Sequence, residues 1–143
     1  MANQNNGARA QALTPQAQKA QAAIASAEQK FLKLARESEV GLSFQTESFY
    51  ALQRIIENPQ LARIAANNVT SLRMAVVNVA AVGLTLNPAE KLAYLVPRDG
   101  RVVLDISYRG LIKIAVDVGA ITMAKPELVY EKDQFEWRGP MDA

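Results

Sequence analysis

The sequence contains neither cysteine nor histidine, and these two absences remove much of the usual chemistry of small proteins. Without cysteine there is no disulfide framework and no thiolate nucleophile, a composition typical of an intracellular chain. Without histidine the common zinc sites and every histidine-based triad are excluded. The glycine-rich loops that bind nucleotides and dinucleotides are also missing. We therefore expect a cytoplasmic protein that uses no cofactor and no bound metal.

A strong charge of one sign is lacking as well. The chain has 16 Lys and Arg against 14 Asp and Glu, a net charge of +2, so any basic site must be local. The longest apolar stretch, residues 69–86, is interrupted by Arg73, Asn78 and Gly83, which indicates a buried helix rather than a membrane span. With 143 residues, 50% of them hydrophobic, the chain is long enough for a single modest domain. We expect no membrane partner.

The N-terminal residues 1–45 are expected to be a disordered or partly helical arm. Residues 1 to about 25 are rich in Ala and Gln and show no apolar stripe, so we expect them to be dispensable for folding. A short amphipathic helix around Phe31 is predicted for residues 26–34, followed by a linker over residues 37–46. The folded domain is predicted to begin at residue 46 and to run to residue 143.

The pattern of the next segments predicts three helices. Residues 46–57 show apolar side chains at helical spacing, with Thr46 or Ser48 as the cap. Pro59 can open the following helix. Residues 71–82 are apolar on nearly every side and end at Gly83, which predicts the central buried helix of the domain.

After Pro88 the period of the apolar residues changes from that of a helix to that of a strand. Two β-rich runs, residues 92–96 and 101–106, flank Asp99-Gly100, which predicts a hairpin with one face in the core. A helix over residues 110–118 should follow and end at Gly119. Its expected inward side chains are those of Leu111, Ile114, Ala115 and Val118.

Three more short strands are predicted at residues 121–123, 128–130 and 135–137, so the expected fold class is α+β. It combines N-terminal helices, a buried central helix, a β-hairpin, a short helix and further short antiparallel strands. The sequence stops directly after the last expected strand and a turn, and a domain rarely ends in this way. We therefore expect the domain that begins at residue 46 to be incomplete at its C-terminus.

The clearest functional signal is the junction between the hairpin and the next helix. Backbone N–H groups at a helix N-terminus favour an anion, and Arg109 and Lys113 add a planar fork and a point charge for phosphate. Gly110 lets another chain come close, and Tyr108 can stack on a base for about 1 to 3 kcal/mol. The alternative is a Tyr108 packed in the core beside a capped helix. The residues expected to contact DNA are Tyr108, Arg109, Gly110 and Lys113, with Arg98, Arg101, Lys125 and Lys132 extending the basic surface.

Four ordered blocks of sequence resemble the RecT family of phage single-strand annealing proteins, in its N-terminal half. The blocks are GLTLNP at 83–88, AYLVP at 93–97, YRGLI at 108–112 and VYEKDQF at 129–135. The resemblance implies a non-enzymatic, ATP-independent protein that binds single-stranded DNA and anneals complementary strands in phage-type recombination and DNA repair. It also implies self-assembly into rings or filaments and a partner 5′–3′ exonuclease that produces the single strand. Because family members continue through further strands and helices, the resemblance implies that residues 46–143 are the N-terminal part of the annealing domain and that this length alone anneals weakly.

Two alternatives remain open at this point. The first is a scaffold module that only self-assembles, with its arginines solvated. The second is a magnesium-dependent nuclease built on the acidic residues Glu127, Glu131, Asp133 and Glu136. Alternating carboxylates on short strands are more often a solvated face, so the nuclease is the weaker alternative.

Overall fold

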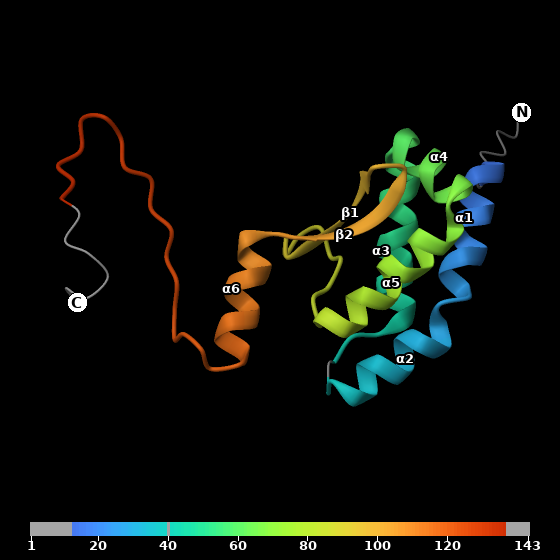
Figure 1. The fold of residues 1–143 in the computed structure, drawn as a ribbon, viewed down its shortest axis with the longest axis horizontal. Helices are drawn as coiled ribbons and strands as arrows, with labels where there is room; N and C mark the ends of the chain where they lie inside the picture. Colours follow the sequence, from blue (N-terminus) through green and yellow to red (C-terminus); the bar gives the residue numbers. More distant parts are fainter. Residues whose placement is uncertain (1–12, 40, 137–143) are drawn as a thin grey trace, which may run out of the picture. The chain divides into compact units, whose positions relative to one another are not determined.

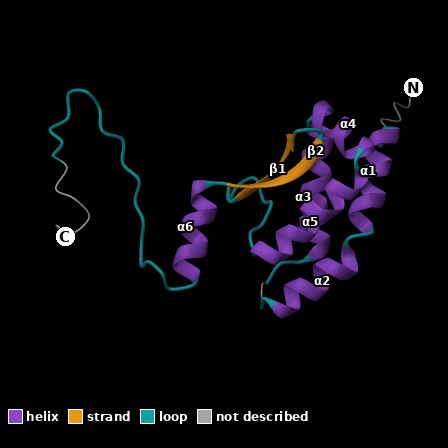
Figure 2. Ribbon diagram, in the orientation of Figure 1, coloured by secondary structure: helices purple, strands orange, loops and turns teal. Residues whose placement is uncertain are grey.

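The computed structural model describes residues 13–39 and 41–136, and this part of the chain forms six helices and one two-stranded antiparallel sheet (Figures 1 and 2). The fold is therefore α+β, as predicted, with five helices before the hairpin and one after it. The chain divides into two units, Met1–Leu111 and Ile112–Ala143. Nearly all the secondary structure lies in the first unit. The division expected at residue 45 stays a prediction.

The first helix corrects the expectation that residues up to about 25 have no face to bury. Helix α1, Pro15–Ala25, begins with Thr14, whose hydroxyl accepts a hydrogen bond from Ala17 N at 3.2 Å. It packs against α3, α4 and α5 (Figure 1) and buries Ala17, Ala20 and Ile24. Small alanine side chains at helical spacing allow neighbouring helices to approach closely, so a segment that lacks large apolar residues can still belong to the core. Residues 1–12 lie outside the described part.

Helix α2, Glu28–Glu37, confirms the short amphipathic helix predicted around Phe31. Its buried side chains, Phe31 and Ala35, lie on the side that packs against α5. The ring of Phe31 meets that of Phe44 edge-on, with centroids 5.3 Å apart. This contact draws Phe44 into the core, and helix α3, Phe44–Glu57, begins there rather than at the caps predicted from Thr46 and Ser48.

Asparagine side chains start the next two helices. Helix α4, Pro59–Asn67, opens with the predicted Pro59, and Asn58 Oδ1 accepts from Leu61 N at 3.0 Å. Helix α5, Val69–Val82, begins two residues before the predicted start because Asn68 Oδ1 accepts from Ser71 N at 3.1 Å. It ends at Gly83 with φ +75°, the left-handed conformation that glycine adopts without strain.

Helix α5 is the centre of the core, as its sequence predicts. Its buried residues occupy most of its circumference, and it packs against α1, α2 and strand β2. One buried polar residue, Ser71, connects the helix to the hairpin, because its hydroxyl accepts a hydrogen bond from Val102 N at 3.0 Å. The strand therefore meets the helix with its backbone donor satisfied.

The predicted hairpin is confirmed. Strands β1, Ala93–Arg98, and β2, Arg101–Ile106, pair antiparallel, and their turn has φ +50° at Asp99 and +68° at Gly100. Positive φ at both turn residues is the type I′ geometry that suits the twist of a hairpin. Alternate residues of β1 face the core. The opposite face carries Tyr94 across from Asp105, and Arg98 across from Arg101.

The part of the chain after the hairpin differs from the prediction. Helix α6, Tyr108–Asp117, forms, but its expected inward residues Leu111 and Val118 are 57% and 72% exposed. Described residues 118–136 form no strand, so the strands predicted at 121–123, 128–130 and 135–136 are wrong, and residue 137 lies outside the described part. A strand needs a paired neighbour to be stable, and residues 118–136 pair with no strand. An amphipathic helix buries its apolar face only where another element covers it, and residues 118–136 form no such element.

Candidate functional site

The junction between β2 and α6 is held by one serine. Ser107 Oγ donates to Lys91 O at 2.6 Å and accepts from Gly110 N at 3.1 Å, while Ser107 N donates to Leu92 O at 2.9 Å. These bonds fix the start of α6 against the segment that precedes β1. The first turn of the helix therefore presents its next two side chains, Tyr108 and Arg109, from a rigid support.

Gly110 has a different part from the one expected. It is buried, and a Cβ there would lie 2.8 Å from Leu84 Cδ1, 2.9 Å from Ile106 Cγ2 and against the Leu92 carbonyl oxygen. The close approach that glycine permits is thus to this chain's own backbone. Its N–H already donates to Ser107 Oγ, so it adds no donor for an anion.

Tyr108 and Arg109 are exposed and touch each other. Tyr108 is 58% exposed, which contradicts the alternative of a tyrosine packed in the core. Arg109 Nε donates to the Tyr108 hydroxyl at 3.3 Å, and this bond raises the pKa of Arg109 above its ordinary value. Tyr94 raises the pKa of Arg109 in the same direction to a smaller extent. An aromatic ring and a permanent cation are therefore held side by side.

The outer face of the hairpin carries two more of the expected arginines. Arg98 lies directly across from Arg101 next to the turn, and both are exposed. Arg98 reaches back along this face to Asp105, with Nη2 and Oδ1 3.6 Å apart, at the level of Tyr94. Like charges placed opposite each other destabilise a hairpin, so this pair is an arrangement that packing alone does not favour.

The three expected lysines lie in the second unit, and two of them are paired there. Lys113 Nζ lies 2.7 Å from Asp117 Oδ2, and Lys125 Nζ lies 2.6 Å from Glu127 Oε1. Lys132 is exposed. The structure thus places Tyr108 and Arg109 against each other in the first unit and Arg98 across from Arg101 on the hairpin, whereas the lysines belong to the second unit.

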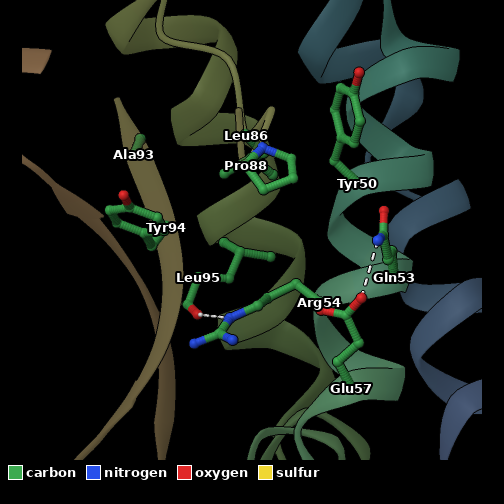
Figure 3. A pocket seen from close by; sticks show the side chains of 9 residues that line it. All are labelled: Tyr50, Gln53, Arg54, Glu57, Leu86, Pro88, Ala93, Tyr94 and Leu95. Atoms are coloured by element: carbon green, nitrogen blue, oxygen red, sulfur yellow. Dashed lines mark hydrogen bonds between the residues drawn. The ribbon is translucent and has the colours of Figure 1, made fainter. Parts of the chain in front are cut away.

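A groove next to Tyr94 was not found from the sequence. It has a volume of about 180 Å³ and lies between α3, the loop before β1 and β1 itself (Figure 3). The floor of the groove is apolar. At one end, Arg54 Nε donates to Leu95 O at 3.5 Å. The groove is lined by Tyr50, Gln53, Arg54, Glu57, Leu86, Pro88, Ala93, Tyr94 and Leu95.

The signal for this groove was present on α3. Tyr50, Gln53, Arg54 and Glu57 follow the i, i+3, i+4, i+7 spacing of one helix face, between the apolar positions that gave the helix its prediction. The spacing shows that these side chains share a face. It does not show what lies opposite, because the other wall comes from residues 86–95, in a distant part of the sequence.

A buried carboxylate holds the second wall of the groove in place. Glu47 on α3 is only 2% exposed, and its two oxygens accept from Thr85 Oγ1 and from Leu86 N, each at 2.7 Å. Thr85 Oγ1 in turn accepts from Asn87 N at 3.1 Å. The loop that precedes β1 is therefore attached to α3 by charge-assisted hydrogen bonds, which are the stronger kind.

The acidic residues of the alternative nuclease do not form a metal site. Asp133 Oδ2 accepts from Tyr130 N at 2.8 Å, and Glu127 pairs with Lys125. Among the described residues, no group of three or more acidic side chains is placed to hold a metal ion. Within the same residues, none of the helices has the length and apolar character needed to cross a membrane.

Comparison with known proteins gives one match. Residues 45–141, well over half of the chain, match the model of the RecT family. All four sequence blocks, at 83–88, 93–97, 108–112 and 129–135, lie inside the matched range. Neither the curated proteins nor the solved structures contain a match.

Proposed function

Because the chain belongs to the RecT family, we propose that it binds single-stranded DNA and anneals complementary strands without ATP, in phage-type recombination. The observation that carries this proposal is the exposed Tyr108–Arg109 pair at the start of α6. A guanidinium binds a phosphate oxygen pair through its planar fork, and a tyrosine ring stacks on a base whatever its identity. Their fixed contact presents both functions to neighbouring parts of one nucleotide.

Annealing needs little more than such contacts. Complementary strands repel through their phosphates, so a protein that neutralises part of this charge lowers the cost of bringing them together. Base pairing then supplies both the specificity and the driving force. The contacts proposed here reach phosphates and base faces, so we expect slight sequence preference and no requirement for ATP.

We also propose that copies of the chain assemble on DNA and that a 5′–3′ exonuclease supplies the single strand. Assembly multiplies weak single-site contacts into useful avidity. The exposed Phe49 and Ile56 on α3, 65% and 51% exposed, support a protein contact on the first unit. A scaffold that assembles without binding DNA is the competing function, and a DNA titration distinguishes the two.

The test is binding to unrelated single-stranded oligonucleotides at several salt concentrations, measured by fluorescence anisotropy. Arg109→Ala should weaken binding to all sequences alike and reduce the salt slope by about 0.7, the value for one phosphate contact on a single strand. Tyr108→Ala should weaken binding by about 1 to 3 kcal/mol per stacked base and leave the salt slope unchanged. Arg63→Ala, on an exposed face of α4, is the matched control. Unchanged affinity and slope in both site variants would refute the proposed site.

A further inference from the structure

The free edge of strand β2 is a feature that the proposed function does not use. In an antiparallel pair, consecutive residues direct their backbone N–H and C=O groups alternately toward and away from the partner strand. Ser107 N donates toward β1, to Leu92 O at 2.9 Å, and Val102 N donates in the opposite direction, to Ser71 Oγ. Leu104 shares the direction of Val102, so both of its backbone groups point away from β1. In the part of the chain that the structure describes, no other strand pairs with β2 on that side.

A groove of about 390 Å³ lies along this edge, between β2 and α5. We call it the edge groove. Its α5 wall includes Met74 and Asn78, which are both exposed and share a helix face at i and i+4, and its β2 wall includes Arg101, Val103 and Leu104. All of these residues belong to the first unit. The volume falls within the roughly 300 to 1,000 Å³ of ligand sites, so the edge groove admits a short segment of chain.

We infer that the edge groove binds an extended acidic peptide of a partner protein, which pairs with Leu104 as a third strand of the sheet. When a peptide adds to a sheet edge, main-chain hydrogen bonds supply affinity and pockets for alternate side chains supply specificity. The free backbone groups of Leu104 offer the hydrogen bonds. Met74, which is 49% exposed, and Val103 offer the apolar contact. A nucleic acid has no row of N–H and C=O groups that matches a strand, so this edge favours a peptide over DNA.

The charges at one end of the edge groove determine the sign of the peptide. Arg98, Arg101 and Asp99 line that end, so its charge is positive. Arg98 pairs with Asp105, whereas the guanidinium of Arg101 forms no ion pair or hydrogen bond with any described residue. A carboxylate of the peptide would give Arg101 a charge-assisted partner and offset its repulsion by Arg98.

One consequence rests on the proposed function. Arg98 and Arg101 also belong to the surface on which we expect DNA, so the acidic peptide and the DNA strand should compete for them. Tyr108 and Arg109 lie outside the edge groove and should keep their DNA contacts. A saturating peptide should therefore weaken single-strand binding and reduce its salt slope by about 1.4, twice the value for one phosphate contact.

The test is amide hydrogen exchange of the intact chain, followed by NMR. The probe is a synthetic peptide of alternating valine and threonine that ends in two aspartates. In the free chain the Leu104 amide should exchange faster than that of Val103, whose N–H points toward β1. With the peptide at about ten times its dissociation constant, exchange at Leu104 should slow about tenfold by mass action, and exchange at Val103 should stay the same.

Two altered peptides separate the backbone contribution from the charge. A peptide methylated on the amide nitrogens that face β2 loses its donors and should leave exchange at Leu104 unchanged. A peptide with lysines in place of the aspartates should bind about 2- to 30-fold more weakly, because an exposed attraction becomes a repulsion of similar size. Arg101→Glu should reverse the order of the acidic and basic peptides, and Arg63→Glu, on an exposed part of α4, is the matched control.

Equal slowing by the methylated peptide, or no slowing by any peptide, would overturn the inference. Slow exchange of Leu104 in the free chain would do so too, because the edge would then be covered by this chain or by a second copy. If oligothymidine alone slows Leu104 as the acidic peptide does, the edge groove is a DNA contact, and the inference fails while the proposed function stands. If the chain binds no oligothymidine, the proposed function fails, and the exchange measured with the peptide still decides the inference.

Discussion

The buried carboxylate of Glu47 provides the sharpest test of how the fold positions its site. Glu47 connects α3 to the loop at residues 85–87 through two hydrogen bonds of 2.7 Å. The same loop carries Leu86 and Pro88 into the groove. Removing this carboxylate should therefore loosen the packing of the loop as well as lower stability.

The expected magnitude follows from the two bonds. A hydrogen bond to a charged group contributes about 1.5 to 3 kcal/mol, so Glu47→Ala should lower the free energy of unfolding by about 3 to 6 kcal/mol. Domains are stable by only about 5 to 15 kcal/mol in total. Glu47→Gln keeps the shape and one acceptor oxygen, so it should lose about half as much. Thr85→Val removes the hydroxyl that donates to Glu47 and that accepts from Asn87 N, and it should lose at least about 1.5 to 3 kcal/mol.

Urea unfolding followed by circular dichroism measures these differences, with Glu131→Ala as an exposed control that should change little. In the double variant Glu47→Ala with Thr85→Val the losses should not add, because both changes break the same bond. If Glu47→Ala lowers the free energy of unfolding by less than 1 kcal/mol, the bonds to the loop contribute nothing, and the account of how the groove is held is wrong.

Three further predictions concern the packing. Ile24→Ala should lower the free energy of unfolding by about 2 to 5 kcal/mol in urea, and an unchanged midpoint would mean that α1 does not belong to the core. Gly110→Ala should cost about 1 to 3 kcal/mol by the same measurement, since its methyl group would meet Leu84 and Ile106, and normal stability would exclude that contact. Val79→Asp should abolish cooperative thermal unfolding, because it buries a carboxylate, and a normal transition would place α5 at the surface.

Local signals in the sequence were sufficient for the elements that local chemistry determines. Asp99-Gly100 specifies its own turn, Gly83 specifies a helix end, and the continuous apolar run before it specifies burial. Pro59 opens α4 because its fixed φ and missing N–H suit the first helical position. Each of these predictions depends on a few adjacent residues, and each is confirmed.

The features that depend on distant contacts were not predictable in this way. The α1 segment is rich in glutamine and lacks large apolar residues, so its composition does not indicate burial. Its alanines are buried because α3, α4 and α5 lie against them. The groove exists because α3 and β1 face each other, which no periodicity in either segment reveals. The sequence correctly predicted that α6 has an apolar face, but the prediction that this face is buried was wrong. Periodicity shows which side chains share a face and does not show whether another element covers them.

Replacing one arginine of the pair at the hairpin tip should change the stability of the fold and the affinity for DNA in opposite directions. Arg98 and Arg101 lie directly across from each other, and like charges in that position cost about 0.2 to 1 kcal/mol. A phosphate between them would turn this repulsion into two attractions. Arg101→Gln should therefore raise the free energy of unfolding by about that amount, while it weakens single-strand binding and reduces the salt slope by about 0.7. Urea unfolding and anisotropy on the same variant measure both effects, and a variant that loses stability together with affinity would show that Arg101 supports the fold rather than the DNA.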